Sequence, residues 1–153
     1  MFQNYTGAAE ALLRLQDTYR LDTTMLANGV IPSIKNQHPI DYNDLNNNNK
    51  RNIVDNSIDS ATKLVMPLTA NDCYELGRQA YHQKDYHHTV LWMKEALRRL
   101  NDEYNESPSM ANKLRYDRVN ILEHLAFASY QLGSLQEAYE YTVDLLDINP
   151  NHE

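Results

Sequence analysis

The stretch that decides the fold is Leu68–Leu100, LTANDCYELGRQAYHQKDYHHTVLWMKEALRRL. A second stretch, Val119–Pro150, reads VNILEHLAFASYQLGSLQEAYEYTVDLLDINP and has the same pattern. In both, apolar side chains recur every three to four residues on either side of a short turn, which is the spacing of amphipathic helices. The turns are expected near Gln83–Asp85 and Gly133–Ser134. The pattern predicts two helical hairpins in succession.

The two hairpins align with each other at a fixed offset. Placing Gly77 over Ala126 also puts Leu76 over Leu125, Tyr81 over Tyr130, Tyr86 over Leu135 and Thr89 over Ala138. These positions approximate the tetratricopeptide template, a helix–turn–helix of about 34 residues that is repeated in arrays. We therefore expect an all-α fold of tetratricopeptide-like hairpins, with about five helices in the chain.

Two residues are expected to begin helices as caps. Thr69 precedes Asp72, and Ser134 precedes Glu137, at the three-residue offset of a capping box. The second helix of the first hairpin should turn one apolar stripe toward the core, namely Trp92, Met93, Ala96, Leu97 and Leu100.

Three segments are expected along the chain. Residues 1–29 form a helical linker, with one helix over 7–28 that ends at Asn28–Gly29. Residues 30–66 include Pro32, Pro39 and the Asn46–Asn49 run, and we expect a disordered, flexible Asn-rich insertion. A lid over an active site is the alternative for this insertion. Residues 67–153 form the peptide-binding repeat domain.

Composition narrows the function class. The chain of 153 residues has a formal net charge of −7 and no run of more than two basic residues, so we expect no nucleic-acid partner. It has no apolar run near the roughly 18–20 residues that span a bilayer, so we expect no membrane partner. The single Cys73 excludes an internal disulfide framework.

The first helix of each hairpin lines the concave face of such repeats, and its exposed stripe recurs at about i, i+4 and i+7. The stripe is Tyr74, Arg78 and Tyr81 in the first hairpin, and Glu123, Phe127 and Tyr130 in the second. Four of these six residues are aromatic. The alternative is that the rings only pack between helices. An aromatic groove with few charges suits polyproline II segments, which are stiff and have free carbonyl groups.

Several strings in the chain together resemble one family. GAAEALLRLQDTYRLDT (Gly7–Thr23), the Leu68–Leu100 stretch and LLDINPNHE are similar, in the same order, to the α subunit of collagen prolyl 4-hydroxylase. They correspond to its linker and its peptide-substrate-binding domain. The resemblance covers nearly all of the chain except the Asn-rich insertion and the 101–118 connection.

The resemblance implies a segment that docks proline-rich procollagen strands for 4-hydroxylation in the endoplasmic reticulum lumen. It implies protein disulfide isomerase as the β subunit, and Fe(II), 2-oxoglutarate, oxygen and ascorbate for the catalytic domain. The family's groove acid and adjoining tyrosines fall at Glu123, His124, Phe127 and Tyr130, of which only Tyr130 is still tyrosine. His124 thus joins the six stripe residues as a seventh candidate. The family also draws groove residues from a further helix, which would follow Glu153.

No catalytic or metal-binding residue is expected in this chain. A non-haem iron dioxygenase needs two histidines and a carboxylate, and none of the six histidines begins a His-x-Asp or His-x-Glu triplet. We expect His87 and His88 on a solvated face or in helix packing, and the chain to be inactive alone. A free-standing repeat adaptor is the alternative function. A third is an assembly role, with Gly7–Thr23 serving dimerisation.

Overall fold

The computed structural model describes residues 3–30, 66–106 and 111–150, and the side chains of 6–30, 66–105 and 117–150. These residues form six helices and no strand, which confirms the all-α prediction. The helices are α1 (Gln3–Tyr19), α2 (Thr23–Ala27), α3 (Ala70–His82), α4 (Tyr86–Glu106), α5 (Ala111–Gln131) and α6 (Leu135–Ile148). Residues 31–65, and with them most of the expected insertion, lie outside the described residues.

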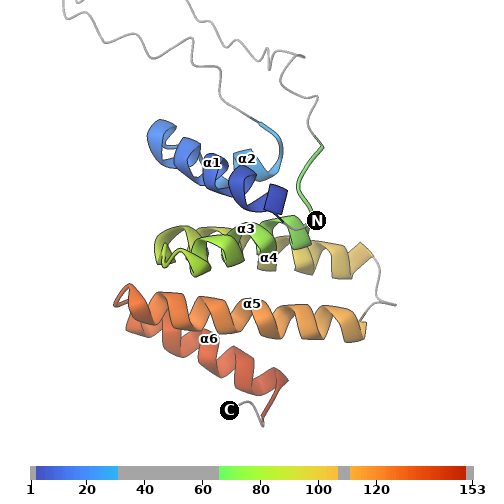
Figure 1. Cartoon of the computed structure of the whole chain (residues 1–153). Coiled ribbons are helices and arrows are strands. Elements are labelled where there is room, and N and C mark those ends of the chain that lie inside the picture. Colours follow the sequence, from blue (N-terminus) through green and yellow to red (C-terminus); the bar gives the residue numbers. More distant parts are fainter. Residues whose placement is uncertain (1–2, 31–65, 107–110, 151–153) are drawn as a thin grey trace, which may run out of the picture.

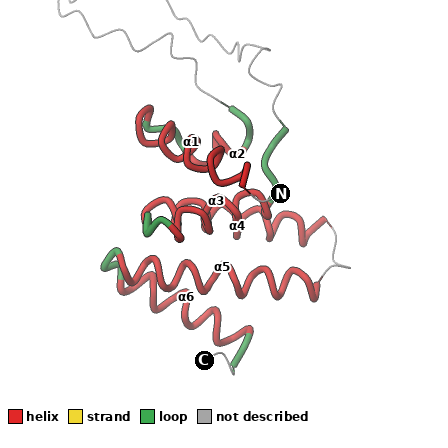
Figure 2. The backbone as a smooth tube through the Cα atoms, viewed as in Figure 1, coloured by secondary structure: helices red, strands yellow, loops and turns green. Residues whose placement is uncertain are grey.

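The helices are stacked in pairs (Figures 1 and 2). α3 and α4 form one antiparallel hairpin, α5 and α6 form the next, and α1 with α2 lies on the side of the first hairpin away from α5. Both hairpin turns fall where the sequence predicts them. Each turn contains a residue with a left-handed backbone, Lys84 (φ 61°) and Gly133 (φ 79°), at equivalent positions of the two hairpins.

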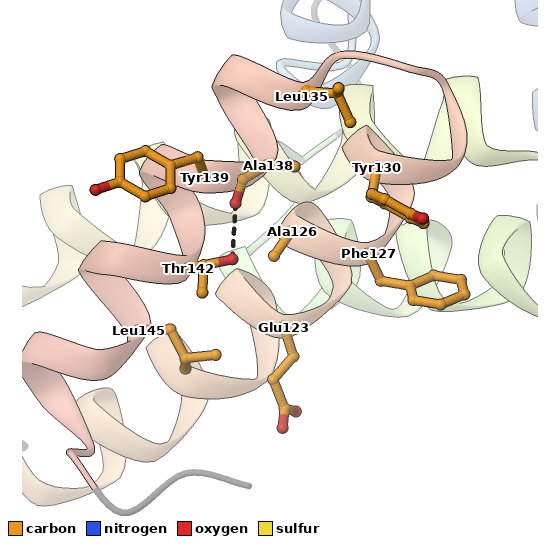
Figure 3. A pocket seen from close by; sticks show the side chains of 9 residues that line it. All are labelled: Glu123, Ala126, Phe127, Tyr130, Leu135, Ala138, Tyr139, Thr142 and Leu145. Carbon is orange, nitrogen blue, oxygen red and sulfur yellow. Dashed lines mark hydrogen bonds between the residues drawn. The ribbon is translucent and has the colours of Figure 1, made fainter.

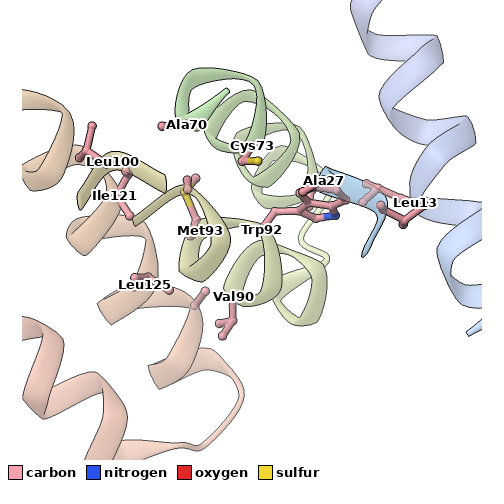
Figure 4. Close-up of a cluster of buried hydrophobic side chains, with 14 residues drawn as sticks. Leu13, Ala27, Ala70, Cys73, Val90, Trp92, Met93, Leu100, Ile121 and Leu125 are labelled. Atoms are coloured by element: carbon pink, nitrogen blue, oxygen red, sulfur yellow. The ribbon is translucent and has the colours of Figure 1, made fainter. Parts of the chain in front are cut away.

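The core lies between the helices of the first hairpin and extends to both neighbours (Figure 4). Trp92 and Met93 are fully buried, and Leu13, Ala27, Ile121 and other apolar residues belong to the same cluster. The predicted stripe of α4 is confirmed, since four of its five residues are buried and Leu97 packs against them. α4 therefore holds the N-terminal helices on one side and α5 on the other.

The expected single helix over 7–28 is wrong, because the chain breaks between Tyr19 and Thr23. Arg20 takes a left-handed backbone conformation (φ 50°), and the Asp22 carboxylate accepts a hydrogen bond from Met25 N at 2.9 Å as the cap of α2. An aspartate that can cap favours a new helix start over continuation. The break turns Leu26 and Ala27 into the core and makes the helix count six rather than about five.

The two expected capping boxes have different outcomes. Thr69 Oγ1 accepts from Asp72 N at 3.2 Å and Asp72 Oδ2 accepts from Thr69 N at 2.9 Å, so the first box is confirmed. The second is wrong, since Ser134 makes no side-chain cap hydrogen bond. Its partner Glu137 instead forms an ion pair with Lys94 of α4, with 3.1 Å between Oε2 and Nζ. A contact between hairpins has replaced the local one.

Buried polar contacts attach α1 to the first hairpin. Trp92 Nε1 donates to Gln16 Oε1 at 3.0 Å, and Gln16 Nε2 donates to Thr23 Oγ1 at 2.8 Å. The His88 ring is buried, with Nδ1 at 2.6 Å from Asp85 Oδ2 and Nε2 at 3.3 Å from Asp17 Oδ1 of α1. His88 thus has the packing role expected for one histidine of its pair.

Candidate functional site

A continuous run of rings joins the first helices of the two hairpins. Tyr74 meets His124 with ring centroids 5.7 Å apart, and Tyr81 meets His124 at 4.8 Å and Phe127 at 5.6 Å. Tyr86, the first residue of α4, contacts Tyr81 at 6.2 Å and Phe127 at 6.0 Å. All these pairs are edge-on, the arrangement that aromatic quadrupoles favour. We call these five residues the aromatic strip.

The strip is packed and open at the same time. Tyr74, Tyr81 and Tyr86 are half-buried, whereas Phe127 leaves 42% of its surface exposed. The two interpretations of the stripe, packing between helices and lining a groove, therefore describe the same side chains. Rings that pack edge to edge leave their other surfaces for a ligand.

The helix backbone fixes the orientation of the His124 ring. Its Nδ1 lies 2.7 Å from the main-chain oxygen of Asn120, one turn earlier in α5. A carbonyl oxygen only accepts, so Nδ1 carries the proton in this contact. In the neutral ring Nε2 is then a hydrogen-bond acceptor, so His124 adds an acceptor nitrogen to a strip whose other polar side-chain atoms are tyrosine hydroxyls.

The remaining predicted site residues lie around the strip rather than in it. Arg78 forms an ion pair with Glu75 of its own helix, with 2.6 Å between Nη2 and Oε2. Tyr130 is 61% exposed one turn beyond Phe127, and Glu123 lies one turn before it. The structure thus joins Tyr74, His124, Tyr81 and Phe127, in that order, through successive ring contacts.

A pocket of about 510 Å³ opens beside the strip, between α5 and α6 (Figure 3). It is lined by Glu123, Ala126, Phe127, Tyr130, Leu135, Ala138, Tyr139, Thr142 and Leu145. At the offset of the hairpin alignment, Glu123, Tyr130 and Leu135 correspond to Tyr74, Tyr81 and Tyr86, the three rings of the first hairpin that face α5. In the first hairpin, the equivalent surface is covered by α5. The pocket is therefore the surface of the second hairpin that corresponds to the α5-binding surface of the first.

Sequence reasoning missed two contributors to this region. Tyr86 aligns with the repeat template but is not among the predicted groove residues, because it belongs to the second helix of its hairpin. Tyr139 of α6, 67% exposed, lines the pocket from a helix in which the sequence predicts no groove residue. The alignment of Tyr86 with Leu135 indicates this role in the sequence, since each is the first residue of the second helix of its hairpin and lies at the groove.

Within the parts of the chain that the structure describes, no three or more of His, Cys, Asp and Glu are grouped as a metal site would need. Among the helices of those same parts, none is both long and apolar enough to cross a membrane.

The fold and this site define a class, the tetratricopeptide-type repeat proteins, here with an aromatic face shared by two hairpins. Comparison with known families agrees. The model of the prolyl 4-hydroxylase peptide-substrate-binding domain matches residues 70–153, and that of the N-terminal region of the prolyl 4-hydroxylase α-subunit matches residues 2–33. The chain belongs to the prolyl 4-hydroxylase α-subunit family.

The chain is similar to individual relatives over most of its length. It is 36% identical to human prolyl 4-hydroxylase subunit alpha-1 over 151 residues, which cover 99% of this chain and 22% of that protein. The identity is 38% with the chicken alpha-1 subunit over the same shares, and 39% with the Caenorhabditis elegans alpha-1 subunit over 96% of this chain and 20% of that one. The chain thus spans about a fifth of the length of these relatives.

Proposed function

We propose that the aromatic strip binds proline-rich peptide in the polyproline II conformation, as the peptide-substrate-binding segment of a procollagen-proline 4-hydroxylase α subunit. The observation that carries this proposal is the unbroken ring contact from Tyr74 through His124, Tyr81 and Phe127 to Tyr86. The binding residues are Tyr74, Arg78, Tyr81, Glu123, His124, Phe127 and Tyr130, with Tyr86 added from the structure.

The chemistry of the ligand follows from the rings. A polyproline II segment has no internal hydrogen bonds and little conformational entropy left to lose, so it can bind to a surface that offers mainly flat apolar contacts. Prolyl rings repeat along it and can pack against tyrosine and phenylalanine faces. The one cation on the stripe, Arg78, is already paired with Glu75, so the groove presents little positive charge to an acidic peptide.

The rest of the assignment extends the family membership to the whole protein. We propose residues 1–29 as a linker, 30–66 as an insertion and 67–153 as the peptide-binding domain. The full protein would hydroxylate procollagen prolines in the endoplasmic reticulum lumen, with protein disulfide isomerase as β subunit. Fe(II), 2-oxoglutarate and ascorbate would then serve a domain other than this one. An oxidoreductase activity is accordingly assigned to the full protein and not to this segment.

Calorimetric titration of the chain with (Pro-Pro-Gly)3 and with polyproline tests the proposal. We expect saturable binding of micromolar or weaker affinity, competed by either peptide. A glycine- and serine-rich peptide of equal length is the control and should not bind. Absence of binding to both proline peptides would overturn the proposal and favour the free-standing adaptor, whose ligand would then differ in kind.

A further inference from the structure

A second, smaller pocket lies at the other end of the aromatic strip. It has a volume of about 100 Å³ and is lined by Ala70, Asn71, Tyr74, Leu100, Glu103, Asp117, Asn120 and Ile121. Tyr74 belongs both to this pocket and to the strip, so the two are continuous. The volume suits a few atoms of a ligand rather than a whole ring system, since one water in the liquid takes about 30 Å³.

The two asparagines of this pocket are equivalent residues of the two hairpins. Asn71 lies six residues before Gly77, and Asn120 lies six residues before Ala126. They stand on the first helix of each hairpin, on the face that carries Tyr74 and Glu123 one turn later. Among the described residues, no hydrogen bond engages either side-chain amide, although Asn120 uses its main-chain oxygen for His124. The pocket therefore offers two carboxamides from opposite walls.

A carboxamide complements a peptide unit. Its NH₂ group donates to a main-chain carbonyl, and its oxygen accepts from a main-chain N–H. A proline-rich strand has free carbonyls throughout, but an N–H occurs only where a residue other than proline stands. Glu103 already accepts from Ala70 N at 3.0 Å, and Asp117 adds a further acceptor to the pocket. The pocket thus favours a peptide unit that still has its amide hydrogen.

The distance to the strip sets a register for such a ligand. Asn71 precedes Tyr81 by ten residues, and Asn120 precedes Tyr130 by ten. Ten residues of α-helix rise about 15 Å. A polyproline II strand advances about 3.1 Å per residue, so about five ligand residues separate the two points. If a peptide runs along α3 with one proline ring at Tyr81, the ligand residue about five positions from that proline lies at the asparagines.

We infer that Asn71 and Asn120 form a main-chain-binding subsite that selects, within a proline-rich ligand, a secondary amide about five residues from the proline held at Tyr81. The inference rests on the proposed function and deepens it. Hydrogen bonds to the peptide main chain would fix the position of a ligand that the groove otherwise binds through its proline rings. In (Pro-Pro-Gly)3 a glycine stands five residues from a proline in either chain direction, whereas in a single Pro-Pro-Gly none does.

The test titrates wild type, Asn71→Ala, Asn120→Ala and the double variant with (Pro-Pro-Gly)3 and with its analogue in which every glycine is N-methylated. A neutral hydrogen bond changes an equilibrium by about threefold to tenfold. Each single variant should weaken (Pro-Pro-Gly)3 by that factor, and N-methylation should weaken wild type similarly. N-methylation should have no further effect on the double variant. Asn105→Ala, an exposed asparagine of α4 outside the pocket, is the matched control and should equal wild type.

The variants are suited to this comparison because neither replaces a cap or a core residue. Asn71 is exposed, and the main-chain oxygen that Asn120 gives to His124 survives the substitution. Thermal unfolding of each variant verifies the fold. If (Pro-Pro-Gly)3 binds wild type and all variants alike, the subsite is refuted while the proposed function stands. If wild type binds neither (Pro-Pro-Gly)3 nor polyproline, both fail together.

Discussion

Removing the ring of Tyr81 should cost peptide binding more than any other single change in the groove. Tyr81 is the centre of the aromatic strip, with His124 at 4.8 Å, Phe127 at 5.6 Å and Tyr86 at 6.2 Å. Tyr81→Ala removes a stacking surface for proline, and the loss of an aromatic anchor is typically about 1–3 kcal/mol, or about fivefold to 150-fold in affinity. Titration calorimetry with (Pro-Pro-Gly)3 measures this directly.

The same substitution should also lower stability, and the two effects must be separated. Tyr81 has two ring contacts with α5, and each such pair is worth about 0.5–1.5 kcal/mol beyond area burial. Urea unfolding of Tyr81→Ala should therefore show a loss of at least about 1–3 kcal/mol. Tyr81→Phe is the matched control, since it keeps every ring contact and removes only the hydroxyl. A folded Tyr81→Ala protein that binds like wild type would refute the assignment of the strip as the groove.

Four further outcomes are expected. Lys84→Gly should stabilise the fold by about 0.5–1 kcal/mol in urea unfolding, because glycine takes the left-handed φ of 61° without strain. Ser129→Ala should be neutral or stabilising by up to about 1 kcal/mol, since the buried Ser129 hydroxyl has no hydrogen-bond partner among the residues that the structure describes. Cys73 should not react with Ellman's reagent at pH 8 until the protein unfolds. Burial raises the pKa of its thiol to about 12, although the nearby positive charge of Arg99 lowers it, and the thiolate fraction at pH 8 is then about 10⁻⁴. Glu95→Gln should destabilise by about 1–3 kcal/mol at pH 7. Burial alone would raise the pKa of Glu95, but hydrogen bonds from two arginines bring the pKa below its usual 4.5. The stability that this group contributes to the wild type is therefore present above pH 4.5 and is lost as pH falls through the lower pKa of the folded state. The Gln variant should lack that pH dependence.

The regular part of the fold was predictable because its signals are local. The apolar spacing around Trp92 and Met93 is long and periodic, and the turn at Gly133 contains the residue type that a left-handed backbone favours. Thr69 and Asp72 satisfy each other within one turn of helix, so their capping box could be identified from four residues. Each of these features depends on side chains a few positions apart.

The features that sequence reasoning missed depend on distant partners. Glu137 has the spacing of a capping box, but Lys94, 43 residues earlier, takes its carboxylate. The break at Arg20 brings no glycine or proline, and it is favoured by burial of α2 against α4 as well as by the Asp22 cap. Tyr86 reaches Phe127 because α5 packs against the first hairpin at that point. Lys94 and Glu137, like Tyr86 and Phe127, lie on different hairpins, so no short stretch of sequence contains both members of either pair.

The groove wall formed by α3, which carries Tyr74 and Tyr81, has an anchor of its own, and this bears on where substitutions should act. The α3 wall belongs to a hairpin anchored on its far side, where Arg99 of α4 donates to Leu68 O and to Asn28 Oδ1, each at 2.6 Å. Asn28 and Leu68, which lie on either side of residues 31–65 in the sequence, are thus joined through the same arginine of α4. Both contacts are made by residues outside 31–65, so we expect a change within that range to leave the anchor of α3 intact. Substituting Arg99 removes the anchor itself, and its effect on peptide binding would reach the groove through the position of α3 rather than through any contact with the ligand.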